Sequence, residues 1–185
     1  FHRSAIVKVA EIPRRQKFVT ICAEMNISIW GFKDLRSHVL SLNQMYRPVD
    51  ELVTMNDSVL MIFKSGEAQL FKYDEDLDDL VFIRTETSFD HDKKVHDVES
   101  FPRLNLFITG SLDGYAKVWN VKKELIREIK FPEKVYSVSF LNPDGDILVG
   151  HHGKVSMVSH NDYNPFELPK ESQPSAEELE LFYQR

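Results

Sequence analysis

Hydrophobic and polar residues alternate along most of the chain up to about residue 160. The alternation occurs in short runs rich in β-branched and aromatic residues, at 5–9, 17–21, 26–30, 59–63, 68–71, 80–83, 106–108, 115–119, 135–140, 147–149 and 155–158. Turn-forming pairs such as Asp113-Gly114 and Asp144-Gly145 lie between neighbouring runs. Period-two runs separated by turn signals are typical of β-strands, and no helical stripe interrupts them. The pattern therefore predicts an all-β fold.

The alternating runs also repeat along the chain. A shift of 89 residues superimposes like residues, among them His2 on His91, Thr20 on Thr109 and Trp30 on Trp119. Two weaker copies are centred on Phe71 and Val158, so that the markers Trp30, Phe71, Trp119 and Val158 are 41, 48 and 39 residues apart. A repeat of about 40–45 residues with four strands is the pattern of a propeller blade.

Residues 90–120 resemble a WD40 repeat most fully, through Asp90-His91, Ile108-Thr109-Gly110-Ser111, Asp113-Gly114 and Trp119-Asn120. The resemblance implies a WD40 β-propeller fragment made of four four-stranded antiparallel blades plus a short C-terminal helix. The blades are expected at 1–46, 47–89, 90–130 and 131–161, the second and fourth being divergent, with a linker and short helix at 162–185. The start at Phe1 favours the last four blades of a larger propeller in a longer chain.

In WD40 proteins a complete blade holds a hydrogen-bonded tetrad of His, Ser or Thr, Asp and Trp. The resemblance assigns this tetrad in the third blade to His91, Thr109, Asp113 and Trp119. In the first blade it assigns His2, Thr20, Glu24 and Trp30, where the longer Glu24 carboxylate leaves the closure of the set open. The same Thr, His and Asp have the composition of a hydrolase triad, but their spacing recurs with the repeat, which favours a structural role.

The composition limits the chemistry that the chain can carry. It has 23 basic and 29 acidic residues, a net charge of −6, which gives no general attraction to nucleic acid. The longest apolar run, Val59 to Phe63, is too short to cross a membrane. A single cysteine, Cys22, permits no internal disulfide and fits a reducing, cytoplasmic compartment. We predict no nucleic acid or membrane partner.

Two groups of residues have part of the pattern of a metal site. The acidic loop at 74–78 lacks the glycine and glutamate of a calcium loop, since Asp79 and Thr85 occupy their places. His151, His152 and His160 have no carboxylate or thiol at ligand spacing to complete a zinc site. We therefore predict no metal and no cofactor.

The resemblance also implies where partners bind. In WD40 proteins, contacts concentrate on a narrow top rim, three and five residues after the blade His and one before the turn Asp. By position these are Lys94, His96 and Leu112 in the third blade, Lys134, Tyr136 and His151 in the fourth, and Asp50 and Lys64 in the second. Tyr136 is the predicted anchor, because aromatic residues dominate interface hot spots.

These features predict a non-catalytic scaffold that assembles a multiprotein complex. One alternative is a substrate receptor of a ubiquitin ligase, although Lys33 and Lys122 occupy the places where such receptors often carry Arg. A propeller enzyme is a further alternative. The divergent blades resemble those of long WD-repeat proteins of ciliary and flagellar axonemes, which implies tubulin or axonemal subunits as partners and a cytoplasmic or ciliary location.

The chain changes character after about residue 161. Prolines at 165, 169 and 174 end strand pairing. Ser175 and Glu178 then form a capping box, and Leu179, Phe182 and Tyr183 lie within one helical face. The sequence leaves two interpretations open, a short docking helix and a frayed terminal turn.

Overall fold

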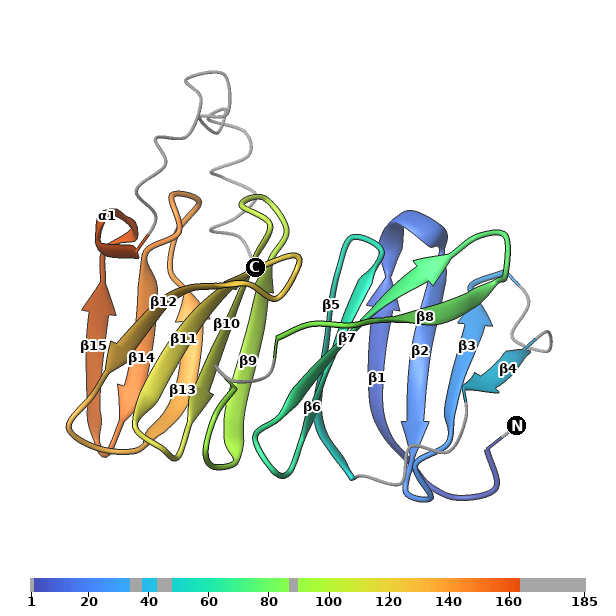
Figure 1. Ribbon diagram of the computed structural model, residues 1–185, viewed down its shortest axis with the longest axis horizontal. Coiled ribbons are helices and arrows are strands. Elements are labelled where there is room, and N and C mark those ends of the chain that lie inside the picture. The colour runs from blue at the N-terminus through green and yellow to red at the C-terminus, as the bar shows by residue number, and fades with distance from the viewer. Residues whose placement is uncertain (1, 34–37, 43–47, 87–89, 164–185) are drawn as a thin grey trace.

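The computed structural model describes residues 2–33, 38–42, 48–86 and 90–163, which form four antiparallel sheets (Figure 1). The first sheet contains β1 (Ile6–Ile12), β2 (Lys17–Cys22), β3 (Ile27–Gly31) and β4 (His38–Leu42), with a short 3-10 helix at Pro13–Arg15. The second contains β5 (Val49–Met55), β6 (Ser58–Phe63), β7 (Ala68–Asp74) and β8 (Asp79–Ile83). The third contains β9 (Val95–Phe101), β10 (Leu106–Ser111), β11 (Tyr115–Asn120) and β12 (Leu125–Lys130). The fourth contains β13 (Val135–Phe140), β14 (Ile147–His151) and β15 (Lys154–Val158).

Each sheet is a meander in which strands adjacent in sequence pair with each other. This arrangement confirms the predicted all-β fold, and each predicted blade range contains one sheet. The sheets stand side by side in a row that is not closed, with β1, β5, β9 and β13 in contact with their counterparts in the neighbouring sheets (Figure 1). The architecture is that of a propeller-like fragment.

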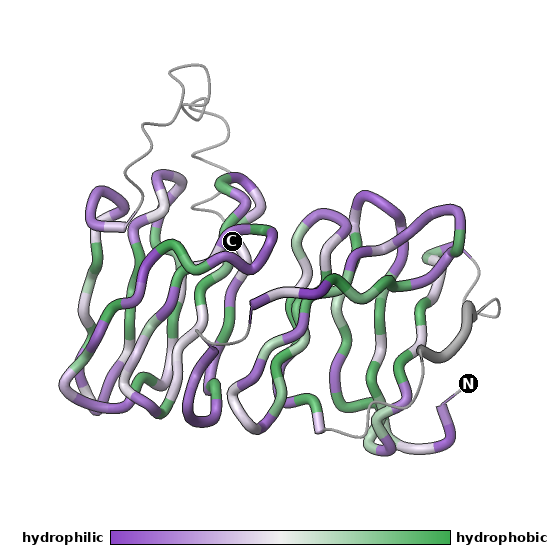
Figure 2. The backbone as a smooth tube through the Cα atoms, viewed as in Figure 1, coloured by the Kyte–Doolittle hydropathy of each residue, from purple (hydrophilic) through white to green (hydrophobic). Residues whose placement is uncertain are grey.

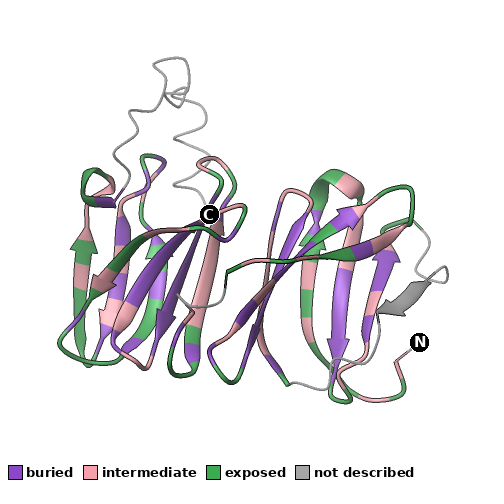
Figure 3. Ribbon diagram, viewed as in Figure 1, coloured by how far each residue is buried: buried purple, intermediate pink, exposed green. Residues whose placement is uncertain are grey.

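Apolar residues concentrate in the strands, while polar residues gather in the turns (Figure 2). Buried apolar side chains of neighbouring sheets form shared clusters. Successive residues of a strand point to opposite faces, so one strand serves two interfaces. In β10, Phe107 packs with the second sheet and Ile108 with the fourth, and both are fully buried. Every residue of β6 and β10 is buried for this reason (Figure 3).

A glycine sets the spacing between the third and fourth sheets. A Cβ at Gly110 would lie 2.7 Å from a methyl group of Val135 and 2.8 Å from one of Val138. Such distances are far inside van der Waals contact, so only glycine lets β13 come this close to β10.

Carboxylates also join these two sheets. The Val138 N–H donates to Asp97 Oδ2 at 2.9 Å, and the Phe140 N–H donates to Glu99 Oε2 at 2.7 Å. Both acceptors lie on β9 and both donors on β13, the first strand of the next sheet. Side chains of one sheet therefore satisfy backbone donors of another.

The prediction of four four-stranded blades is wrong for the fourth sheet, which has three strands in the described part of the chain. After β15 the chain turns into a short helix, α1 (His160–Tyr163). Asp146 accepts from the His160 N–H and lies 2.8 Å from its ring Nδ1, and Tyr163 donates its hydroxyl to Gly145 O. These contacts draw the chain away from the edge of β15. The predicted helix at 175–183 lies outside the described residues.

None of the helices in the described ranges has the length and apolar character needed to cross a bilayer. The cysteine, Cys22, is buried at the end of β2.

Candidate functional site

A relay of hydrogen bonds runs through the third sheet. Trp119 Nε1 donates to Thr109 Oγ1 at 2.9 Å, and Thr109 Oγ1 lies 2.8 Å from His91 Nε2. His91 Nδ1 lies 2.8 Å from Asp113 Oδ2. Because an ionised carboxylate only accepts, we assign the proton to Nδ1, so that Nε2 accepts from the threonine hydroxyl. The structure thus brings together all four side chains of the tetrad that the sequence resemblance assigns to the third blade.

Asp113 anchors this relay through several donors. Besides His91, the Asp92 N–H donates to Oδ2 at 3.2 Å and the Tyr115 N–H to Oδ1 at 3.0 Å. Burial acts to raise the pKa of Asp113, but these hydrogen bonds outweigh it and the pKa lies below its ordinary value. The carboxylate is therefore held in its ionised form.

The first sheet forms only part of the same relay. Trp30 Nε1 donates to Thr20 Oγ1 at 2.7 Å, and Thr20 Oγ1 lies 2.6 Å from His2 Nε2. The Glu24 side chain is exposed and makes no hydrogen bond to His2 in the described structure, although its backbone N–H donates to Ser4 Oγ at 3.3 Å. The structure therefore brings His2, Thr20 and Trp30 together without Glu24.

A second buried polar contact, which the sequence did not reveal, ties the second sheet to the third. Lys123 Nζ lies 2.7 Å from Asp90 Oδ1 and also donates to the Glu86 carbonyl at 3.0 Å. Asp90 Oδ2 accepts from the Ala68 N–H of β7 at 2.9 Å. Burial raises the pKa of Asp90 despite these partners. A lysine in a turn usually projects into solvent, so the pattern carried no signal for this ion pair.

The residues predicted for the rim lie at matching ends of three sheets. Lys94 Nζ lies 3.2 Å from Asp50 Oδ2, which links the third sheet to the second. His96 Nδ1 donates to the Tyr136 carbonyl at 3.0 Å, and the two rings meet edge-on at 5.4 Å, which links the third sheet to the fourth. Tyr136 remains 39% exposed. The predicted rim is therefore a surface whose members from different sheets touch.

The other rim residues differ in exposure. Lys64 and Lys134 are exposed, and Leu112 is half-buried with its N–H donating to the Lys94 carbonyl at 3.1 Å. His151 is buried, and its Nε2 lies 2.8 Å from Ser156 Oγ. We define the rim surface as Asp50, Lys64, Lys94, His96, Leu112, Lys134 and Tyr136.

The placement of His151 on the rim is corrected by the strand register. Val135 pairs with His151 as Val95 pairs with Ser111. His151 thus corresponds to Ser111, and the position that corresponds to Leu112 is His152, which is exposed. The third sheet has the same shift in pairing between Gly110 and Ser111, so the two sheets correspond residue by residue and the rim position of the fourth sheet is His152.

The described residues contain no cluster of three or more His, Cys, Asp or Glu side chains able to hold a metal ion. The buried polar groups described above are those of the relay and of the Asp90–Lys123 pair, and each set is held by contacts among its own members and with nearby backbone groups. The arrangement can hold sheets together and present a surface.

Comparisons with known proteins agree with this geometry. No curated protein sequence gives a significant match. In structure, the chain is similar to the computationally designed Ika4 protein, with a TM-score of 0.67 and 18% identity over 86% of this chain and 93% of that one. It is also similar to the computationally designed Ika8 protein, with a TM-score of 0.65 and 19% identity over 85% of this chain and 46% of that one. The sequence model of the WD domain, G-beta repeat, matches residues 83–120, so the segment that carries β9 to β11 and the complete relay is a WD40 repeat.

Proposed function

We propose that this protein is a non-catalytic scaffold that binds other proteins through the rim surface. WD40 repeats generally mediate protein–protein interaction. The observation that carries the proposal is the pair of contacts Lys94–Asp50 and His96–Tyr136, which connect rim residues of three sheets. A surface fixed by strands and by its own contacts loses little conformational entropy when a partner binds.

The uncovered faces of the end sheets support a larger propeller. Ile6 pairs with Cys22 as Val95 pairs with Ser111, yet Ile6 is 51% exposed and Val95 is 1% exposed. At the other end of the row, Val155 and Met157 of β15 are 72% and 64% exposed. Further sheets of the same kind, packed on both end faces, complete the scaffold.

Tyr136→Ala tests the rim surface. We expect it to weaken capture of the native partners by about 2 kcal/mol, or about 30-fold, because buried aromatic anchors carry much of an interface's free energy. The measurement is quantitative affinity purification of the full-length protein from its own cells. Phe82→Ala is the matched control, since Phe82 is an exposed aromatic on the outer strand β8. Equal effects of the two substitutions, or no effect of Tyr136→Ala, would contradict the proposal.

A proposal about which assembly the protein belongs to rests on the sequence resemblance alone. We propose an axonemal assembly with tubulin or neighbouring subunits as partners, so that the tagged full-length protein accumulates along the axoneme of ciliated cells. A uniform cytoplasmic distribution would remove this proposal while leaving the scaffold untouched. Recovery of a ubiquitin-ligase adaptor with the protein would instead favour the receptor alternative.

A further inference from the structure

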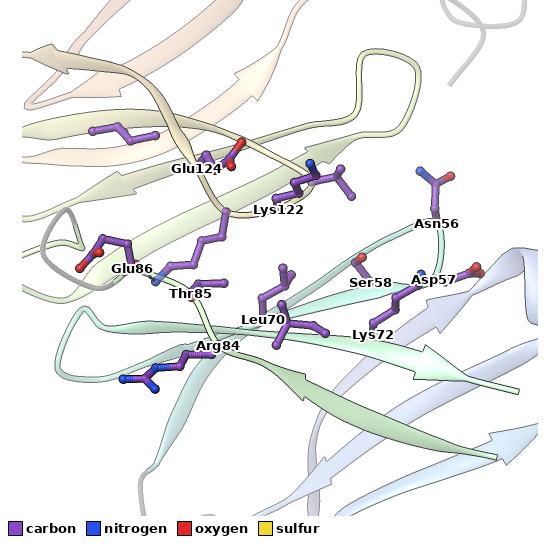
Figure 4. Close-up of a pocket in the computed structure, with 14 residues that line it drawn as sticks. Asn56, Asp57, Ser58, Leu70, Lys72, Arg84, Thr85, Glu86, Lys122 and Glu124 are labelled. Carbon is purple, nitrogen blue, oxygen red and sulfur yellow. Dashed lines mark hydrogen bonds between the residues drawn. The ribbon is translucent and has the colours of Figure 1, made fainter. Parts of the chain in front are cut away.

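A groove of about 1000 Å³ opens where the second sheet meets the third (Figure 4). Its apolar lining comes from Leu70, Ile83, Val121 and Leu125. The β5–β6 turn and the β11–β12 turn border it on the two sides, so both sheets contribute. The groove is separate from the rim surface, because it shares no residue with it.

The charged groups around this groove are unevenly paired. Arg15 binds Asp57 through two hydrogen bonds of 2.8 and 2.9 Å, and Asn120 donates to Glu124 at 2.5 Å. By contrast, the side chains of Lys72, Arg84 and Lys122 are exposed and form no ion pair within the part of the chain that the structure describes. The groove therefore offers unpaired cationic groups beside an apolar surface. This combination suits a segment with both glutamates and large apolar residues.

A series of contacts connects the last described residues with the groove. Tyr163 in α1 bonds to the Gly145 carbonyl, and a Cβ on Gly145 would lie 2.7 Å from Leu104 Cδ1. Next to Leu104, Asn105 accepts a hydrogen bond of 2.9 Å from Asn56, which lines the groove. Two touching turns thus separate the end of α1 from the groove.

The sequence beyond α1 has the complementary chemistry. Residues 175–183 contain Glu177, Glu178 and Glu180 together with Leu179, Leu181, Phe182 and Tyr183. Residues 164–174 precede them, and a chain of this length can span up to about 36–40 Å when extended. We propose that residues 175–183 bind in this groove of the same molecule, with the apolar side chains on its floor and the glutamates near Lys72, Arg84 and Lys122. This inference does not depend on the proposed rim partners.

The first test uses the full chain and a zero-length carbodiimide, which joins a lysine to a carboxylate only when they touch. We expect crosslinks from Lys72 or Lys122 to Glu177, Glu178 or Glu180, found by mass spectrometry, and none from the exposed control Lys154. Mixing ¹⁴N- and ¹⁵N-labelled protein separates links within one molecule from links between copies. Links only between copies, or equal links to Lys154, would overturn the proposal.

The second test measures hydrogen exchange of the amides at 121–125 and 83–86. We expect the double substitution Leu179→Ser with Phe182→Ser to increase their exchange rates, while the matched control Phe166→Ser, in the preceding segment, leaves them unchanged. We also expect Glu180→Lys to increase the rates and the added substitution Lys122→Glu to restore them. Groove exchange that does not respond to any of these tail substitutions would overturn the proposal. Unchanged hydrogen-exchange rates of the backbone amides in β6 and β10 verify that each variant is folded.

Discussion

The second and third sheets place different chemistry at the same backbone positions. Phe71 pairs with Val59 as Trp119 pairs with Phe107, and Met61 therefore corresponds to Thr109. In the third sheet Thr109 and Trp119 belong to the relay. In the second sheet the corresponding residues, Met61 and Phe71, are apolar and pack against the first sheet. Both sheets nevertheless have four strands in the same order.

The comparison shows that the hydrogen-bonded relay is not required for the architecture of a sheet. Burial of apolar strands between two neighbours is sufficient to build it, since the second sheet is formed in this way. The relay instead makes the third sheet dependent on individual polar partners, because a buried group that loses its partner keeps the full cost of its desolvation. Substitutions in the two sheets should therefore differ sharply.

The largest effect is expected at the ion pair between these sheets. Lys123→Met leaves Asp90 buried without its counter-charge, which should lower the free energy of unfolding by about 3–5 kcal/mol. Burial already raises the pKa of Asp90 above its ordinary value of 3.8. Loss of Lys123 raises the pKa of Asp90 further, because Lys123 acts to lower it. A proton taken up by the folded variant removes the unpaired charge, so the deficit should shrink as the pH falls through the pKa of Asp90 in the variant. Chemical denaturation of the wild type and the variant at several pH values measures this deficit in the free energy of unfolding. A deficit that is independent of pH would contradict the prediction.

Thr109→Val should have the next largest effect. Valine keeps the shape but removes the hydroxyl that links Trp119 to His91, and two buried polar groups lose their partner. We expect a loss of about 3 kcal/mol, at roughly 1–3 kcal/mol for each unsatisfied group. Denaturant titration of the full chain provides the number, and a midpoint equal to that of the wild type would show that the relay contributes nothing.

Asp113→Asn should cost about 2 kcal/mol at pH 7, as expected for hydrogen bonds to a charged group. The pKa of Asp113 is lower in the folded state, so its contribution is present above the unfolded value of about 3.8 and is lost as the pH falls through the folded value. The gap between variant and wild type should therefore close below about pH 4. Thermal denaturation of the two proteins from pH 7 to pH 3 tests this, and a gap that widens in acid would contradict the assignment.

The smallest effect is expected at the corresponding position of the second sheet. Met61→Leu preserves volume and leaves no polar group unsatisfied, so we expect a change below about 1.5 kcal/mol. It is the matched counterpart of Thr109→Val, measured by the same titration. A larger loss than that of Thr109→Val would reverse the contrast between the two sheets.

The sequence alone predicted the repeat and the positions of the strongest copies. The period-two runs and the shift between Trp30 and Trp119 are local signals, and local signals are sufficient to locate strands and turns. The all-β fold and four sheets follow from them. The Asp90–Lys123 pair could not be predicted, because it joins residues 33 positions apart whose side chains are usually exposed.

Strand register was a second limit. His151 and His152 are adjacent in sequence, and only the pairing of Val135 with His151 shows which of them is buried. A one-residue difference in pairing exchanges the two faces of a strand. The number of strands in the fourth sheet could likewise not be predicted from the hydrophobic pattern. Asp146 and Tyr163 hold the chain after β15 through contacts with residues distant in sequence, which the pattern does not reveal.

The carboxylates that reach from β9 to β13 have a consequence for solubility. A strand at the edge of a sheet presents free N–H groups, which can recruit a strand of another molecule and start aggregation. Asp97 and Glu99 occupy the N–H groups of Val138 and Phe140 on such an edge. Because these two N–H groups are already bonded, a strand of another molecule cannot pair with them. Asp97 and Glu99 thus oppose intermolecular strand addition, a role that is distinct from their contribution to holding the third and fourth sheets together.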